Sequence, residues 1–207
     1  MNLPNKLTVS RFALTALFLW AMFTPSAINN TLALFLFCLA GITDMLDGRL
    51  ARQRNLITNF GILMDPLADK VLTCSAFVAL VERHALTSPP TTHLGPLTIC
   101  PKVVAWMVVV IVTRELAITG LRLLAASKDV VLAAERYGKH KTISQIVALI
   151  ALLSMEAYAE WPVTVQKFLV PWVPAFAQFV LWLTVILTAT SGILYLAKNR
   201  HLYLDDV

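Results

Sequence analysis

Long apolar runs, separated by short polar or charged segments, dominate the pattern of this chain. They lie near residues 10–27, 31–53, 62–82, 102–125, 138–158 and 174–197. Each run is about as long as the ~20 residues that a helix needs to cross the ~30 Å hydrocarbon core of a bilayer. The pattern therefore predicts six transmembrane helices joined by short connections.

The composition favours the same solvent. Of the 207 residues, 58% are hydrophobic and 14% are charged, and the mean hydropathy is +0.73. These values lie outside the usual range of soluble domains. Six spans and their loops use nearly the whole chain, so we expect a single polytopic membrane domain over residues 1–207. Its expected fold class is all-α.

Cationic residues are distributed unequally over the predicted loops. With the N-terminus in the cytoplasm, thirteen of the seventeen Lys and Arg residues lie on the cytoplasmic side, three lie outside and Arg114 lies within a span. Cytoplasmic loops of membrane proteins retain such an excess of Lys and Arg. The asymmetry predicts cytoplasmic N- and C-termini. It also accounts for the net charge of +5 with anionic membrane lipids as partners and no nucleic acid.

Four aspartates within 26 residues form the main candidate site: Asp44, Asp47, Asp65 and Asp69. In helices the first two are i and i+3 and the last two are i and i+4, so each pair projects from one face of its own helix. Residues 54–61 form a polar segment that ends in glycine, which predicts a turn. Such a hairpin would bring both pairs together at the cytoplasmic end.

Clustered carboxylates at a membrane require a compensating cation. An ionised Asp at the bilayer centre costs about 2.5–3.5 kcal/mol, and like charges add repulsion. Carboxylate oxygens select Mg²⁺ or Mn²⁺, and ligands that leave coordination positions open suit a diphosphate. We therefore expect such a metal site, with two ions plausible. In the alternative, Asp44 and Asp47 form a solvated helix end, and Asp65 and Asp69 stabilise the N-terminus of the next helix.

Two small residues and one cation accompany the first aspartate pair. Gly48 and Ala51 lie on or beside its helical face, where a nucleobase or phosphate can approach the backbone closely. Arg52 lies within reach of the same phosphate.

The spacing of these residues is similar to a family signature. The run Asp-x2-Asp-Gly-x2-Ala-Arg-x8-Gly-x3-Asp-x3-Asp, from Asp44 to Asp69, resembles that of the CDP-alcohol phosphatidyltransferases, with every specified position filled. The resemblance implies that the four aspartates ligate two divalent ions and that Asp69 is also the catalytic base. It further implies a CDP-lipid site formed by Asp44, Asp47, Gly48, Ala51, Arg52, Thr58 and Asp65.

The resemblance also implies a homodimer. The short single domain and the absence of a transit peptide favour the inner (cytoplasmic) membrane of a bacterium. Phosphatidyl transfer joins a lipid-soluble donor to a water-soluble acceptor, so we expect a polar active-site cavity that faces the cytoplasm. The acyl chains of the donor would leave this cavity sideways into the lipid.

Basic residues beyond the aspartates indicate the acceptor: Arg114, Arg122, Lys139 and Lys141 lie at the same cytoplasmic end. Arg offers bidentate contacts to a phosphate and Lys a point charge, which an acceptor that carries its own phosphate needs. The Arg114-Glu115 pair and the Gly-Lys-x-Lys-Thr-x2-Gln run that starts at Gly138 resemble family members that transfer from CDP-diacylglycerol to sn-glycerol 3-phosphate.

Other interpretations stay open for these cations and for the chain as a whole. Arg114 can simply pair with Glu115, and Arg122, Lys139 and Lys141 can serve as anchors at anionic lipid. A cardiolipin synthase or a phosphatidylserine synthase would share the aspartates and differ in the acceptor pocket. Outside the family, an ion-coupled transporter or a prenyl-diphosphate enzyme also uses intramembrane acids. The four histidines show no metal-ligand spacing, and we expect them in loops or interfaces.

Overall fold

The computed structural model describes residues 3–24, 26–54, 59–86, 92–94, 97–99, 101–127 and 136–200. Within these ranges the backbone alone is described for residues 3–8, 44–54, 59–66, 69, 92–94, 97–99, 126–127 and 136–139. The described residues form six long helices: α1 (Leu3–Phe23), α2 (Asn29–Arg54), α3 (Asn59–Leu86), α4 (Ala105–Ser127), α5 (Arg136–Ala157) and α7 (Val173–Lys198). Each coincides with one of the six predicted apolar runs, so the helical fold class is confirmed.

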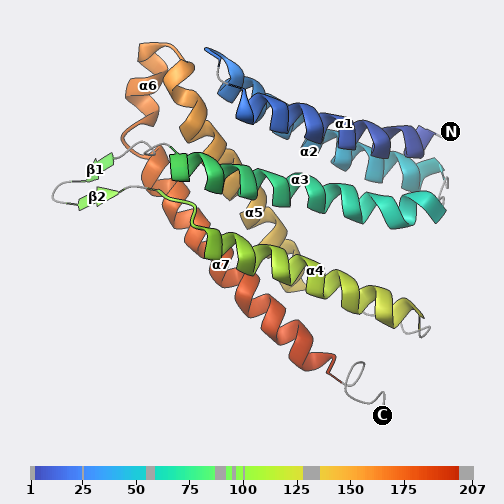
Figure 1. The fold of residues 1–207 in the computed structure, drawn as a ribbon. Coiled ribbons are helices and arrows are strands. Elements are labelled where there is room, and N and C mark those ends of the chain that lie inside the picture. Colours follow the sequence, from blue (N-terminus) through green and yellow to red (C-terminus); the bar gives the residue numbers. More distant parts are fainter. Residues whose placement is uncertain are drawn as a thin grey trace.

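Shorter elements, which the sequence did not predict, lie at one end of the helical bundle. Strands β1 (Thr92–Leu94) and β2 (Leu97–Ile99) form an antiparallel pair between α3 and α4. A 3₁₀ turn, η1 (Tyr158–Glu160), and the short helix α6 (Val163–Leu169) connect α5 to α7. The start of α1 and the end of α7 (Val173–Lys198) lie away from the hairpin and α6 (Figure 1).

The long helices pack in an order that differs from their order in the chain. Helix α1 packs against α2 and α3, α5 packs against α2 and α7, and α4 packs against α3 and α7 (Figure 1). Residues far apart in the sequence therefore meet on neighbouring helices.

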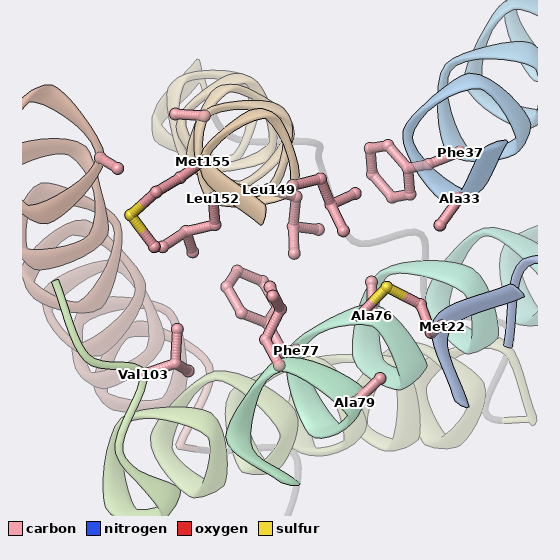
Figure 2. Close-up of a cluster of buried hydrophobic side chains, with 14 of the residues drawn as sticks. Met22, Ala33, Phe37, Ala76, Phe77, Ala79, Val103, Leu149, Leu152 and Met155 are labelled. Atoms are coloured by element: carbon pink, nitrogen blue, oxygen red, sulfur yellow. The ribbon is translucent and has the colours of Figure 1, made fainter. Parts of the chain in front are cut away.

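The hydrophobic core occupies the half of the bundle nearest the hairpin and α6. Phe77, Leu149 and Leu152 are completely buried there, beside Val103 and Met155. Figure 2 shows the Phe77 ring projecting from α3 toward Leu149 and Leu152 of α5. Burying a side chain of this size stabilises the fold by about 1.5–3 kcal/mol. Apolar packing in this half of the bundle therefore holds the helices together.

A carboxylate from the connection after α5 caps the first turn of α2. Glu160 accepts hydrogen bonds from the backbone N–H groups of Asn30, at 2.9 Å, and Thr31, at 2.8 Å. The Thr31 hydroxyl also donates to Glu160, at 2.6 Å, and receives a hydrogen bond from the indole of Trp161, at 2.9 Å. The N-terminal N–H groups of a helix have no partner within the helix, and Glu160 supplies one from 130 residues away.

His84, one of the four histidines expected in loops or interfaces, lies at an interface between helices. This residue lies on α3 with 2% of its surface exposed. Its Nδ1 accepts a hydrogen bond from the backbone N–H of Val103, at 3.0 Å, and its Nε2 lies 3.1 Å from Glu156 of α5. Arg83 pairs with the other oxygen of Glu156, at 3.4 Å. His84 therefore ties α3 to α5 and to the start of α4.

Two of the described helical segments are long and apolar enough to cross a membrane, His140–Glu160 and Val173–Lys198. Val9–Phe23 and Asn29–Thr43 are shorter apolar helices. Large apolar side chains are exposed along α7, among them Phe179 and Ile193, as expected for a surface in contact with lipid. Six membrane spans stay a prediction.

Candidate active site

The four aspartates lie on the two helices that the sequence pattern required. Asp44 and Asp47 are in the C-terminal half of α2, and Asp65 and Asp69 are in the N-terminal half of α3. Since both pairs lie within helices, the predicted i, i+3 and i, i+4 spacings hold for the backbone. The side chains of all four lie outside the described residues, so their convergence stays a prediction.

For the predicted CDP-lipid residues, too, the structure describes at most the backbone. Gly48, Ala51 and Arg52 are in the last turns of α2, and their side-chain environment lies outside the described part of the structure. Thr58 lies outside the described residues altogether.

Two of the predicted acceptor residues meet at a single carboxylate. Glu115 of α4 forms ion pairs with its neighbour Arg114, at 3.3 Å, and with Lys141 of α5. The backbone carbonyl of Glu115 also accepts a hydrogen bond from the ammonium group of Lys70 on α3, at 3.4 Å. Three helices therefore deliver charged groups to one place, which we call the Glu115 cluster: Lys70, Arg114, Glu115 and Lys141.

Three members of the Glu115 cluster are shielded from solvent. The side chains of Arg114, Glu115 and Lys141 are 12%, 9% and 4% exposed. Among the described side chains, the Glu115 carboxylate pairs with two cations, Arg114 and Lys141. The Nε of Arg114 is buried and has no hydrogen-bond partner among the described residues. Two buried cations share one carboxylate among the described residues, and a buried charge requires a partner, so this arrangement suits a phosphate better than a neutral ligand.

Lys70 is the member of this cluster that the sequence analysis did not select. It directly follows Asp69 on α3, so its contact with Glu115 connects the helix of the second aspartate pair to the predicted acceptor residues. The only sign of Lys70 in the sequence is that it adjoins Asp69. The sequence does not indicate that Lys70 contacts Glu115 on α4, 45 residues away.

Arg122 and Lys139 have different surroundings. The guanidinium carbon of Arg122 lies 5.8 Å from the centroid of the Tyr195 ring on α7, an exposed cation–π contact. Lys139 lies in the first turn of α5, two residues before Lys141, and its side chain lies outside the described residues. Among the four predicted acceptor residues, Arg114 and Lys141 are the two that the described contacts bring together.

The described side chains show no metal cluster, and the cavity that they line is apolar. They contain no group of three His, Cys, Asp or Glu residues that could hold a metal ion, but the four aspartates are not among the side chains searched. A cavity of about 290 Å³ lies between α5, α6 and α7, with an almost wholly apolar lining that includes Ile150, Trp161 and Phe176. None of the predicted site residues lines it. The predicted polar cavity stays a prediction.

Comparison with known proteins defines the class of this chain. Residues 1–190 match the CDP-alcohol phosphatidyltransferase family, and the chain belongs to that family. The resemblance seen in the aspartate signature is therefore confirmed, and the chain is a transferase of phospholipid biosynthesis.

Three relatives that share one name match this chain over nearly their whole length. A protein from Bacillus subtilis (strain 168), named CDP-diacylglycerol--glycerol-3-phosphate 3-phosphatidyltransferase, is 38% identical over 96% of this chain and 95% of its own. A Haemophilus influenzae protein of the same name is 31% identical over 100% of this chain and 97% of its own. A third, from Rickettsia felis, is 29% identical over 94% and 93%.

Proposed function

We propose that this chain transfers the phosphatidyl group of CDP-diacylglycerol to sn-glycerol 3-phosphate, giving phosphatidylglycerophosphate and CMP. The observation that carries the proposal is the buried cationic cluster around Glu115, in a chain whose near-full-length relatives bear the name of this reaction. An acceptor that already carries a phosphate dianion requires such a cluster, whereas serine or another acceptor without a phosphate would not.

Asp44, Asp47, Asp65 and Asp69 are the proposed ligands of two divalent ions, Mg²⁺ or Mn²⁺. Their support is the all-carboxylate donor set and the helical spacing of each pair on α2 and α3. When bound, the ions would neutralise the diphosphate of the donor and stabilise the departing CMP. Gly48, Ala51, Arg52 and Thr58 would complete the CDP-lipid site beside the first pair.

Asp69 is the proposed general base. It would take the proton from the primary hydroxyl of glycerol 3-phosphate as that oxygen attacks the phosphorus bonded to diacylglycerol. The bond from this phosphorus to the bridging oxygen breaks, and CMP leaves with the electron pair. The position of Lys70 supports the assignment, because the residue next to Asp69 contacts the cluster that would hold the acceptor.

Arg114 and Lys141 would bind the phosphate of the acceptor, with Lys139 and Arg122 nearer the cytoplasm. Glu115 holds Arg114 and Lys141 close to each other despite their mutual repulsion. It thereby keeps both cations in place before the acceptor arrives, and less reorganisation is needed on binding.

The six long helices would span the cytoplasmic membrane of a bacterium, with both termini in the cytoplasm. The charge asymmetry of the loops, the bacterial sources of the relatives and the two helical segments that meet the length and hydropathy required support this placement. A homodimer is the assembly that the family resemblance implies.

The test is CMP release from CDP-diacylglycerol by the purified protein in detergent with Mg²⁺. Glycerol 3-phosphate, serine, myo-inositol phosphate and phosphatidylglycerol are compared as acceptors. The proposal predicts release with glycerol 3-phosphate that disappears in Asp69→Asn and persists in Glu82→Gln, an exposed acid at the other end of α3. Release with another acceptor alone would overturn the acceptor assignment. Full activity of Asp69→Asn would overturn the assignment of the base.

A further inference from the structure

Gly192 of α7 lies against the stem of Arg114 on α4, where an added side chain would clash. An added Cβ there would lie 2.7 Å from the Cγ of Arg114, 3.6 Å from its Cβ and 4.0 Å from its Cδ. Carbon atoms in good contact are about 3.5–4.0 Å apart. The three nearest atoms all belong to Arg114, so the missing side chain of Gly192 creates the space that the stem of Arg114 fills.

Neighbouring contacts prevent α7 from simply moving away. One to three turns further along α4, Ile118, Leu121 and Ala125 form a buried cluster with Tyr195 of α7. This packing holds the two helices together beside Gly192. A methyl group at residue 192 would therefore displace the flexible Arg114 side chain before it separated the helices.

Displacement of the stem moves the charged head of Arg114. Cγ is the second carbon of the side chain, and every later atom, including the guanidinium, follows its position. The guanidinium lies 3.3 Å from the carboxylate of Glu115, which also binds Lys141. A shift of Cγ would take Arg114 out of the cluster that we assign to the acceptor phosphate.

We propose that Gly192 is a positioning residue for the acceptor site, because its lack of a side chain lets the stem of Arg114 lie against α7. The inference rests on the proposed role of Arg114. Gly192 does not touch substrate; it acts through the side chain that does. Gly41 and Gly120 differ from it, since an added Cβ meets nothing within 4 Å at either position.

Gly192→Ala and its matched control Gly120→Ala test this inference. Both replace a helical glycine by alanine, so both gain the same helix propensity, and only Gly192→Ala meets Arg114. Steady-state kinetics should show a rise of about tenfold in the KM for glycerol 3-phosphate in Gly192→Ala. The KM for CDP-diacylglycerol should stay within about twofold of the parent value in this variant. Gly120→Ala should match the parent in both.

A double-mutant cycle with Arg114→Ala separates positioning from a general packing effect. Arg114→Ala should raise the KM for glycerol 3-phosphate, and Gly192→Ala should raise it no further in that background. If Gly192→Ala lowers the melting temperature, Arg114→Ala should restore it, because the clashing Cγ is then absent. Equal effects of Gly192→Ala in both backgrounds, or an unchanged KM in the single variant, would overturn the inference.

The same experiment distinguishes this inference from the proposed function. If the parent protein does not use glycerol 3-phosphate, the proposed function is wrong, and the melting temperatures of the four proteins still test the clash. If Arg114→Ala leaves the KM unchanged in a protein that uses glycerol 3-phosphate, the role of Arg114 is wrong and the positioning role falls with it. A raised KM in Arg114→Ala with a parent-like Gly192→Ala overturns the positioning role alone.

Discussion

Lys141 of α5 forms an ion pair with Glu115 of α4, and both side chains are almost completely buried. Removing two charges from water costs several kcal/mol per ion before their attraction repays it. A pair of apolar residues would hold α4 and α5 together at no such cost. The pair is therefore better explained by the cations that it keeps in place than by a gain in stability.

Replacing Glu115 alone should destabilise the protein strongly. In Glu115→Gln, Lys141 and Arg114 lose their shared counter-charge while Lys141 stays buried, and breaking such a pair costs about 3–5 kcal/mol. We expect a lower melting temperature in detergent, measured by thermal unfolding, whereas Glu82→Gln, an exposed acid on α3, should match the parent.

The double variant Glu115→Gln/Lys141→Gln refines this prediction. It removes Lys141, one of the two cations that the single variant leaves without their counter-charge, so part of the lost stability should return. Transfer to glycerol 3-phosphate should stay impaired, since a proposed phosphate ligand is gone. A single variant as stable as the parent would contradict the interpretation of Glu115 as the charge that holds this cluster.

The helices could be predicted from sequence because their signal is local. A run of about twenty apolar residues specifies a long helix whatever its neighbours are. The same holds for Arg114 and Lys141 as candidate residues, since a cation in or beside an apolar run is conspicuous. The alternative in which Arg114 pairs with Glu115 is also observed. Glu115 pairs with Lys141 as well, so the Arg114–Glu115 pair is part of the cluster.

Contacts between helices could not be predicted in this way. Lys70 meets Glu115 and His84 meets Glu156 across 45 and 72 residues, because of how α3 packs against α4 and α5. Helical periodicity indicates which residues share a face, but not which helix that face meets. Gly192 was missed for the same reason: its importance depends on the side chain opposite, which belongs to another helix.

Arg122 should contribute to acceptor binding more than to stability. It is exposed and lies over the ring of Tyr195, so its loss leaves no buried group unpaired. A charge-assisted hydrogen bond to a phosphate is worth about 1.5–3 kcal/mol. Arg122→Gln should therefore raise the KM for glycerol 3-phosphate about tenfold or more, with an unchanged melting temperature.

Lys167→Gln is the matched control for Arg122→Gln, because Lys167 is an exposed cation on α6 at the other end of the bundle. Its kinetics should equal those of the parent. If Arg122→Gln behaves like this control, Arg122 is an anchor at anionic lipid and not part of the acceptor site.

Removal of divalent ions should abolish transfer reversibly. Chelation with EDTA should stop CMP release, and added Mg²⁺ or Mn²⁺ should restore it, since four carboxylates form a hard-oxygen site. Asp44→Asn should raise the Mg²⁺ concentration needed for half-maximal release and lower the maximal rate. CMP release that persists in excess EDTA would contradict the metal assignment of the aspartates.

Glu160 should stabilise the fold without taking part in the reaction. Its carboxylate accepts two backbone hydrogen bonds at the start of α2 and one from the Thr31 hydroxyl. In Glu160→Gln the amide NH₂ group would face one of these donors and the charge would be lost. We expect a cost of about 1.5–3 kcal/mol, seen as a lower melting temperature relative to Glu82→Gln.

The aspartates and the Glu115 cluster lie toward the other end of the bundle, so kcat of Glu160→Gln should stay at the parent value at temperatures where the variant is folded. A parent-like melting temperature would show that Glu160 does not act as the cap of α2, and a lower kcat in the folded variant would show that this end of the bundle influences the site.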